Sequence, residues 1–382
     1  MGNKKGHILI TGGAGFIGFY LAELFRESGF SVRILDVASR PDGLAKDIEY
    51  FQGDVTSKGS WSRALQGISH VFHLAAYGDN RPDFHKCFTV NAAASALLYE
   101  VIRDEKLPVK QIIVASSQSV YGEGKYLCKT HGVFYPVSRV KKDLESGLWD
   151  IHCPEDGLLA EVLPSAEEDK LCPVSPYGIS KMAVDHIALT LGRELNIPSV
   201  ALRYSMASGA YPSMRAIYPN AIKYFTEQAL KNESISLHED GNQSRDFIDI
   251  RDLGKAHLAV LDNPAVYFQA FNIGSGKSIK IRDLAEMVYK IVGVEFTPPP
   301  ERRTQKDESD WQKKAKRRIG VHRYKLMVGG FKPVFRNEFR PFTPRHMVMS
   351  IKKIKDVLGW RPVHTLEESI TEYITAVKNK SA

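Results

Sequence analysis

The chain has 382 residues, of which 43% are hydrophobic and 25% charged, as is typical of a soluble globular protein. The net charge of +8 favours polyanionic partners, but no zinc-finger or RNA-binding pattern and no apolar run of roughly 18 residues is present, so we expect no nucleic-acid or membrane partner. Four scattered cysteines, and a short basic lead without a signal-peptide core, predict a reducing, cytoplasmic setting.

The first half of the chain predicts a parallel, doubly wound α/β sheet. Short runs rich in Val, Ile and Leu alternate with segments of helical periodicity, the pattern of strands that are buried on both faces and connected by helices. We predict strands at residues 7–13, 31–37, 48–55, 70–76, 111–117 and 199–204, and helices at 15–29, 60–67 and 87–105.

The second half predicts a smaller lobe built mainly from amphipathic helices. We place the first domain at residues 1–205 and the lobe at residues 206–382, and we expect some segments of 206–382 to return to the first domain. An insertion at about 122–174 and a Pro-, Gly- and charge-rich stretch at 298–339 interrupt the pattern. The basic run Lys313–Arg318 is interpreted as a solvated surface loop, with a nuclear address or an anion-binding arm as alternatives. The helices of the lobe are predicted at 218–232, 281–293, 351–359 and 365–379.

The stretch "ILITGGAGFIG" predicts a Rossmann-type dinucleotide site. Gly12, Gly15 and Gly18 stand between the first strand and the first helix, where glycines allow the backbone to approach a pyrophosphate. Asp36 ends the second strand, where it can accept hydrogen bonds from ribose hydroxyls and repel a 2′-phosphate, which favours NAD over NADP; the nearby Arg40 weakens that preference. The predicted NAD contacts are Gly12, Gly15, Phe16, Ile17, Asp36, Asp54, Val55, Leu74, Ala75, Ala76, Tyr177 and Lys181.

The stretch "SPYGISKMAVDH" predicts an acid–base pair at the start of a helix. Tyr177 and Lys181 are four residues apart and therefore lie on one helix face. A lysine ammonium near a phenol stabilises the phenolate and lowers the phenol's pKa, which turns a tyrosine into a usable proton acceptor.

Together these motifs resemble the extended short-chain dehydrogenase/reductases, in particular the nucleotide-sugar epimerases and dehydratases. The resemblance covers residues 8 to about 378 and rests on "TGGAGFIG", "HLAA", "ASSQSVYG", "YGISK", "EDGNQSRDFIDIRD", "FNIGSG" and "LGWRP". Within the family the chain is most similar to the dTDP-L-rhamnose 4-epimerase and UDP-glucose 4-epimerase types. The resemblance implies a homodimer and the catalytic set Ser117, Tyr177 and Lys181.

The two residues after Ser117 decide between the reactions of this family. Dehydratases carry Asp-Glu there, whereas this chain has Gln118 and Ser119, which cannot act as a carboxylic acid or a carboxylate base. We therefore predict an NAD-dependent nucleotide-sugar 4-epimerase that works through a 4-keto intermediate. A dehydratase or 4-ketoreductase of the same family is the alternative, and a non-catalytic binding protein for NAD or nucleotide sugars is the second.

The resemblance also implies substrate contacts from Ser117, Gln118, Asn220, Arg245 and Arg340. The two arginines would bind the pyrophosphate, because a planar guanidinium can form paired hydrogen bonds with phosphate oxygens. The alternatives are an ion pair of Arg245 with Asp246 or Asp249, and a surface position for Arg340. Many relatives have Phe-Asn where this chain has Ser205-Met206, so the identity of the sugar stays open.

The insertion contains a possible metal-binding pattern. Cys128-x-x-His131 and Cys153-x-x-Asp156 have the paired spacing of tetrahedral zinc ligands. His152 or Cys172 could replace one of the four. From the sequence alone we favour ordinary reduced cysteines in a loop, with a zinc tie as the alternative.

Overall fold

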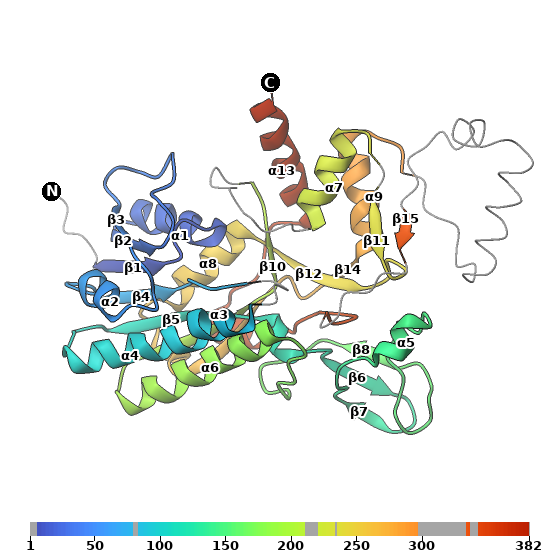
Figure 1. Cartoon of the computed structure of the whole chain (residues 1–382), viewed down its shortest axis with the longest axis horizontal. Helices are drawn as coiled ribbons and strands as arrows, with labels where there is room; N and C mark the ends of the chain where they lie inside the picture. Colours follow the sequence, from blue (N-terminus) through green and yellow to red (C-terminus); the bar gives the residue numbers. More distant parts are fainter. Residues whose placement is uncertain are drawn as a thin grey trace, which may run out of the picture.

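The computed structural model describes residues 6–78, 83–210, 221–233, 235–296, 334–336 and 343–381. A seven-stranded parallel sheet lies at its centre, in the order β13-β9-β5-β4-β1-β2-β3 (Figure 1). All six strands that the sequence predicts are present. Along the sheet these six are β9 (Ser199–Tyr204), β5 (Gln111–Ser117), β4 (His70–His73), β1 (His7–Thr11), β2 (Ser31–Asp36) and β3 (Glu49–Gln52), and the seventh strand, β13 (Gln269–Ile273), was not predicted.

Helices cover both faces of this sheet and bury its two apolar surfaces. On one face α1 (Phe16–Glu27) and α8 (Ile250–Val260) pack on a cluster that includes Ile8 and Ile10. On the other face α2 (Lys58–Ala64), α4 (Ala94–Asp104) and α6 (Pro176–Glu194) pack on a cluster that includes Leu9. Successive side chains of β1 thus pack into the apolar clusters on opposite faces of the sheet, as expected of a strand buried on both faces. The fold is a mixed α/β, Rossmann-like one.

The helix predicted at 87–105 is wrong as a single element. The segment divides into α3 (Phe84–Phe88), a π-helical turn (Thr89–Ala93) and α4. Asn91 lies in this turn, and its amide hydrogen-bonds to both the N–H and the carbonyl of Tyr77. A π-turn inserts an extra residue in a helix, and such turns are frequent at functional sites.

Part of the second half of the chain forms a lobe with its own core, whereas β13, α8 and α12 (Lys352–Leu358) belong to the main sheet or pack on it. Three helices, α7 (Ala221–Leu230), α9 (Ile281–Val292) and α13 (Leu366–Ser381), share a separate apolar cluster. α12 returns to the main sheet, where Lys353 donates to the carbonyl of Ala270 at 2.9 Å. Two small sheets complete the lobe: β10 (Met206–Ser208), β12 (Ser244–Asp249) and β14 (Ser278–Lys280) form one, and β11 (Ser236–His238) and β15 (Val334–Arg336) the other.

Most of the insertion forms a small unit at one side of the molecule (Figure 1). Its three-stranded antiparallel sheet consists of β7 (Gly132–Phe134), β6 (Lys125–Cys128) and β8 (Glu161–Leu163), with α5 (Lys141–Glu145) beside it. Within the described residues, no buried hydrophobic cluster is made by this unit alone. The described part of the chain also has no helix long and apolar enough to cross a bilayer.

Candidate active site

The glycine loop between β1 and α1 brings backbone segments closer than side chains would allow. Gly12 has a φ of +71°, and a Cβ on it would lie 2.8 Å from the backbone nitrogen of Ala75. A Cβ on Gly18 would lie 2.3 Å from the carbonyl oxygen of Gly12. The loop is therefore a narrow, backbone-lined cradle in front of a helix N-terminus, which fits the pyrophosphate of a dinucleotide.

Asp36 faces this loop from the end of β2. Its Oδ2 accepts the backbone N–H of Ala14 at 3.0 Å and its Oδ1 accepts that of Ala38 at 2.9 Å. The guanidinium of Arg40 points elsewhere, because it donates to the carbonyls of Ala45 and Ile48 at 2.6 and 2.9 Å. The Asp36 carboxylate therefore lies at the loop and is not paired with Arg40, which the sequence suggested as a competing cation. A carboxylate in this place suits the ribose hydroxyls of NAD.

Other predicted cofactor residues lie at the ends of neighbouring strands. Leu74 and Ala75 follow β4, and both donate their N–H groups to Thr11 Oγ1 at 3.1 Å. Asp54 follows β3 and caps a turn by accepting the N–H of Thr56 at 2.8 Å. Of the remaining predicted contacts, Val55 is buried, Gly15 and Ala76 are exposed in loops, and Phe16 and Ile17 are partly exposed on the first turn of α1.

Ser117, Tyr177 and Lys181 come from two adjoining elements. Ser117 ends β5 and caps a 3₁₀ turn (Gln118–Tyr121) through the N–H of Ser119 at 3.2 Å. Tyr177 and Lys181 lie in α6, with the ammonium 5.9 Å from the centre of the phenol ring. Lys181 also donates to the carbonyl of Ala115, two residues before Ser117, at 2.7 Å. The lysine thus contacts the strand that carries the serine and lies over the tyrosine.

Burial sets the charge balance around this lysine. Lys181 is 3% exposed, and loss of hydration lowers its pKa to about 8, partly opposed by Asp185. The ammonium is still mostly protonated at neutral pH. His73 lies nearby and is fully buried, and burial together with the charge of Lys181 lowers its pKa to about 3. His73 is therefore neutral and serves as a hydrogen-bonding group between Thr11 and Ser95, at 2.8 and 3.1 Å.

The turn after Ser117 is fixed to α6 by contacts that the sequence analysis did not identify. The hydroxyl of Tyr121 accepts a hydrogen bond from Arg203, whose Nε pairs with Asp185 of α6 at 2.7 Å. A Cβ on Gly178 would lie 2.6 Å from the carbonyl oxygen of Ser119. The glycine after Tyr177 therefore lets the helix approach the turn, and this approach brings the serine and the tyrosine–lysine pair together.

Asn91 is another residue that the sequence analysis missed. It is 1% exposed, and its amide donates to Ser180 Oγ at 2.9 Å. Ser180 in turn donates to the carbonyl of Tyr177 at 2.8 Å. The sequence feature that could have identified it is a polar Asn within the apolar, small-residue segment "TVNAAASALL". A buried amide needs hydrogen-bonding partners, so such an Asn predicts specific contacts.

Gln118 and Ser119 stand where a dehydratase has two carboxyl groups. The amide of Gln118 is 5% exposed, and its Oε1 has no hydrogen-bonding partner among the residues that the structure describes. Ser119 Oγ lies 3.2 Å from Ser117 Oγ. Ser205, just past the end of the neighbouring strand β9, is also buried with an unpartnered Oγ. Buried polar atoms without partners call for an explanation such as a ligand, and these two lie at the carboxyl ends of adjacent strands.

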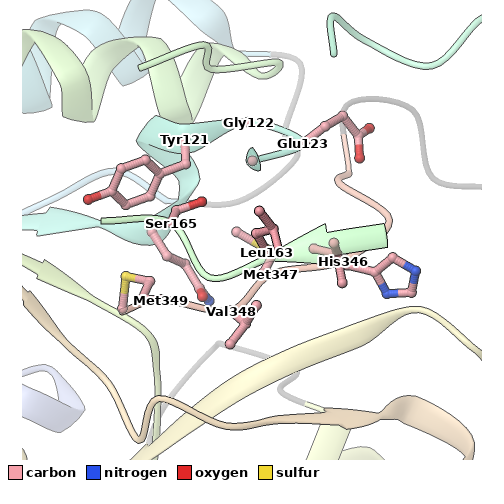
Figure 2. Close-up of a pocket in the computed structure, with 12 residues that line it drawn as sticks. Tyr121, Gly122, Glu123, Leu163, Ser165, His346, Met347, Val348 and Met349 are labelled. Atoms are coloured by element: carbon pink, nitrogen blue, oxygen red, sulfur yellow. The ribbon is translucent and has the colours of Figure 1, made fainter. Parts of the chain in front are cut away.

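Figure 2 shows a hollow beyond this turn, where the chain segment 346–349 runs beside β8. Gln118 and Tyr121 contribute to its lining, together with Glu123 and His346. Ser117, Tyr177 and Lys181 do not. The hollow therefore borders the turn that follows Ser117, but the three predicted catalytic residues do not line it.

Arg245 is buried in β12, and its guanidinium donates to the carbonyls of Ser244, Pro344 and Arg345 at 2.7, 2.9 and 3.2 Å. Burial lowers its pKa to about 10. The alternative ion pair is wrong, because Asp246 accepts from Ser275 and Gly276 and Asp249 pairs with Arg251. The other two predicted substrate residues, Asn220 and Arg340, and the basic run Lys313–Arg318 lie outside the described residues.

The four candidate metal ligands of the insertion converge. One ligand atom each from Cys128, His131, Cys153 and Asp156 lies within 4.8 Å of all the others. His152 and Cys172, the alternatives from the sequence, are not part of this group.

Comparison with known proteins agrees with this geometry. Residues 8–138 and 157–274 match the model of the NAD dependent epimerase/dehydratase family. A curated dTDP-L-rhamnose 4-epimerase of Burkholderia thailandensis is 28% identical, over 96% of this chain and 94% of that protein. A UDP-glucose 4-epimerase of Thermotoga maritima, solved with UDP-glucose, has a TM-score of 0.73 at 22% identity and covers 98% of this chain and 100% of its own.

The same fold also occurs in an enzyme with a different reaction. DesIV, a dTDP-glucose 4,6-dehydratase of Streptomyces venezuelae solved with NAD, has a TM-score of 0.71 at 18% identity and covers 98% of this chain and 97% of its own. Fold alone therefore leaves the reaction open. With the family match spanning most of its length, this chain belongs to the NAD dependent epimerase/dehydratase family, and its cofactor is NAD.

Proposed function

We propose that the protein is a nucleotide-sugar 4-epimerase. The observation that carries this proposal is the pair after Ser117: a buried amide at Gln118 and a hydroxyl at Ser119. Elimination of water needs an acid to protonate the leaving hydroxyl and a base to take the neighbouring proton, and neither residue can supply them at neutral pH. Epimerisation at C4 needs only removal and return of a hydride.

The predicted catalytic residues would each contribute one part of this chemistry. Bound NAD supplies the acceptor that takes the hydride of sugar C4 and returns it. Tyr177 accepts the proton of the 4-hydroxyl, and the neighbouring Lys181 ammonium stabilises the phenolate that does so. Ser117 hydrogen-bonds to the same sugar oxygen as it becomes a carbonyl. When the sugar turns over and the hydride returns to its other face, Tyr177 gives the proton back.

The nucleotide sugar would bind at the carboxyl ends of β5 and β9. Gln118 Oε1 and Ser205 Oγ are unpartnered there, so both can hydrogen-bond to sugar hydroxyls. The relative from Burkholderia thailandensis makes dTDP-L-rhamnose the first substrate to test, and the relative from Thermotoga maritima makes UDP-glucose the second. Arg245, together with Arg340 and Asn220, stays a prediction for the diphosphate.

Isotope labelling tests the reaction. The purified protein would be incubated with dTDP-L-rhamnose, UDP-glucose and a GDP-sugar in deuterated water, and the products read by NMR. We expect one of them to form its 4-epimer without solvent deuterium at C5, and a deuterium placed at C4 of that substrate to remain at C4. A hydride carried within the site does not exchange with water, whereas a proton taken by a carboxylate base does.

Three outcomes would contradict the proposal. Solvent deuterium at C5, or a lasting 4-keto-6-deoxy product, would indicate a dehydratase. Net consumption or formation of NADH in proportion to product would indicate a ketoreductase. Tight binding of all three sugars without any product would indicate a binding protein.

We also propose a homodimer formed through the face that α4 and α6 share. The two helices pack together, and α3 lies beside them on this face (Figure 1). Phe84, Phe88 and Ile179 in α3 and α6 are 50%, 37% and 40% exposed, and a second copy packed against these helices would bury their apolar surface. Light scattering would detect the dimer. A cytoplasmic location also stays a prediction.

A further inference from the structure

The cluster in the insertion has the dimensions of a tetrahedral metal site. His131 Nδ1 lies 3.5 Å from the sulfur of both Cys128 and Cys153, and 3.3 Å from Asp156 Oδ2. Asp156 Oδ2 lies 3.4 Å from the Cys128 sulfur. Zinc bonds of about 2.0–2.3 Å at tetrahedral angles place neighbouring ligand atoms roughly 3.3–3.8 Å apart. One ion at the centre would therefore be within bonding distance of all four atoms.

The local backbone repeats itself around the two ligand pairs. In "CKTHG" and "CPEDG" a cysteine is followed three residues later by the second ligand and then by glycine. Gly132 and Gly157 have φ values of +82° and +69°, and a Cβ on either would meet nothing within 4 Å. Both glycines are thus required by backbone conformation and not by crowding. Each turn points its two ligands to one side, and the two turns face each other.

Surrounding hydrogen bonds hold these ligands in place. The N–H of His131 donates to the Cys128 sulfur at 3.4 Å, and Cys128 pairs with Gly132 across the β6–β7 hairpin. In the second turn the N–H of Cys153 donates to the Leu158 carbonyl at 2.8 Å. The N–H of Leu158 donates to Asp156 Oδ1 at 3.0 Å, which leaves Oδ2 directed at the cluster. Such outer contacts orient metal ligands and accompany most metal sites.

From this arrangement we propose that the insertion binds one structural zinc ion through Cys128, His131, Cys153 and Asp156. Two sulfurs, one imidazole nitrogen and one carboxylate oxygen suit zinc better than magnesium or calcium, which prefer oxygen ligands. On binding, the two thiols lose their protons to solvent and four bonds to zinc form, without any change of oxidation state. Four protein ligands leave no open position for a substrate or water, so the ion has a structural role.

The position of the site explains what the ion would contribute. The insertion has no apolar cluster of its own, and its two cysteine turns come from segments more than 20 residues apart. A metal that joins them closes this loop and restricts the unfolded chain, as a cross-link does. Asp150, just before the second turn, contacts Arg345 of the lobe, and the Trp149 carbonyl accepts from Arg139, which in turn pairs with Glu239 of the lobe. The zinc would therefore also hold the contact surface between the insertion and the lobe.

Metal analysis of the full-length protein tests this inference. The protein would be purified under reducing conditions, dialysed against metal-free buffer and analysed by mass spectrometry of its metals. We expect about one zinc per chain in the native sequence and a loss of at least tenfold in Cys128→Ser and in His131→Ala. Cys172→Ser and His152→Ala are the matched controls, because both residues lie outside the cluster and the His152 ring is hydrogen-bonded to the carbonyl of Asp150. Both controls should keep the zinc.

Cobalt substitution of the native sequence keeps the test decisive if the variants fail to fold. Cobalt bound by two thiolates in a tetrahedron gives intense visible bands and a thiolate-to-metal charge-transfer band, and adding zinc should abolish both. Chelator should lower the melting temperature, and zinc should restore it. The inference is overturned if the native protein holds neither zinc nor cobalt, if the controls lose as much metal as the ligand variants, or if Cys128 and Cys153 are found as a disulfide.

Discussion

Lys181 has the most demanding environment of the proposed catalytic residues. It is buried, its ammonium donates to the Ala115 carbonyl, and it lies 5.9 Å from the centre of the Tyr177 ring. Because burial lowers its pKa to about 8, its charge is available to the phenolate at neutral pH and declines in mildly alkaline solution. In the proposed mechanism, the proton transfer by Tyr177 would therefore weaken as Lys181 loses its charge in alkaline solution.

Replacement of the phenol tests this assignment directly. Tyr177→Phe removes the proton acceptor and leaves the glycine loop and Asp36 unchanged. We expect turnover to fall by roughly 10²–10⁴-fold, the usual contribution of a general base, while NAD binding changes little. Tyr267→Phe is the control and should keep its rate. Tyr267 lies just before the amino end of β13, whereas the site lies at the carboxyl ends of the strands. If Tyr177→Phe retains more than about a tenth of the rate, another group is the base.

A buried histidine links the same region to the pH dependence of stability. His257 Nδ1 faces the carbonyl of Leu253 at 2.8 Å and must donate to it, so Nε2 accepts the Tyr204 hydroxyl at 2.7 Å. Burial lowers the pKa of His257 from 6.5 to about 4. The unfolded chain therefore binds the proton more tightly between these values. The stability that neutral His257 provides is complete above pH 6.5 and is lost as the pH falls toward 4.

We expect this group to contribute roughly 3 kcal/mol to acid destabilisation, at about 1.4 kcal/mol for each pH unit between 6.5 and 4. Urea unfolding at several pH values would measure it. In His257→Gln the dependence of the unfolding free energy on pH should be shallower in that window. His186→Gln, at an exposed position of α6, should leave it unchanged. Parallel curves for the native protein and His257→Gln would contradict the expectation.

At the scale of elements, the sequence predicts long apolar strands better than it predicts features that depend on contacts between distant segments. The six predicted strands have continuous apolar residues because helices cover both faces of the sheet. Such apolar runs can be recognised from the sequence alone. β13 was missed as a strand, since "QAFNI" is short and lies far along the chain from β9, with which it pairs. The helix break at Asn91 was missed because it depends on Tyr77 and Ser180, contacts that no local periodicity shows.

The approach of α6 to the turn after Ser117 gives a prediction at this scale. Gly178→Ala would place a Cβ 2.6 Å from the Ser119 carbonyl oxygen, a backbone atom that cannot move alone. The helix and the turn must separate, and displacements of about 1 Å can cost roughly 10²-fold in rate. We expect a fall of at least tenfold in turnover and a loss of about 1–3 kcal/mol in stability, with NAD affinity preserved.

A matched helical glycine serves as the control for this substitution. Gly59 lies in α2, and a Cβ there would meet only Ser57 Oγ at 3.9 Å. Gly59→Ala should keep full activity and gain up to about 1 kcal/mol of stability, because alanine favours a helix. Steady-state rates and melting temperatures of both variants would be compared. Equal activity of the two variants would show that α6 and the turn do not need this close contact.

At the scale of the whole molecule, a buried charge cluster joins the insertion to the lobe. Arg345 is 1% exposed and contacts Asp150, Glu239 and Asp240 at 2.7–2.9 Å. These partners are between 105 and 195 residues away along the chain. The sequence could not predict the cluster, because an arginine in "TPRH" has no local feature that distinguishes it from a surface residue. The ion pairs between the insertion and the lobe therefore follow only from the three-dimensional structure.

This cluster leads to the prediction for the whole molecule. Arg345→Met keeps an apolar side chain at the buried position but removes the guanidinium, so the carboxylates of Asp150, Glu239 and Asp240 lose the cation they share, and among the described residues Arg139 still pairs with Glu239. Breaking a buried ion cluster from one side typically costs about 3–5 kcal/mol, because the remaining charges stay out of water. Denaturant unfolding should show a loss of this size, whereas exposed Arg361→Met should change stability by less than about 0.5 kcal/mol.

The region that becomes less stable in Arg345→Met distinguishes two roles of this arginine. It can hold the insertion against the lobe, or it can stabilise the whole protein. Amide hydrogen exchange in β6 and β8, the strands of the insertion, should become faster in Arg345→Met under conditions where β1 and β4 remain protected. If the charge cluster merely added to overall stability, exchange would increase to the same extent in the central sheet. Equal increases in both regions would therefore show that Arg345 does not hold the insertion against the lobe.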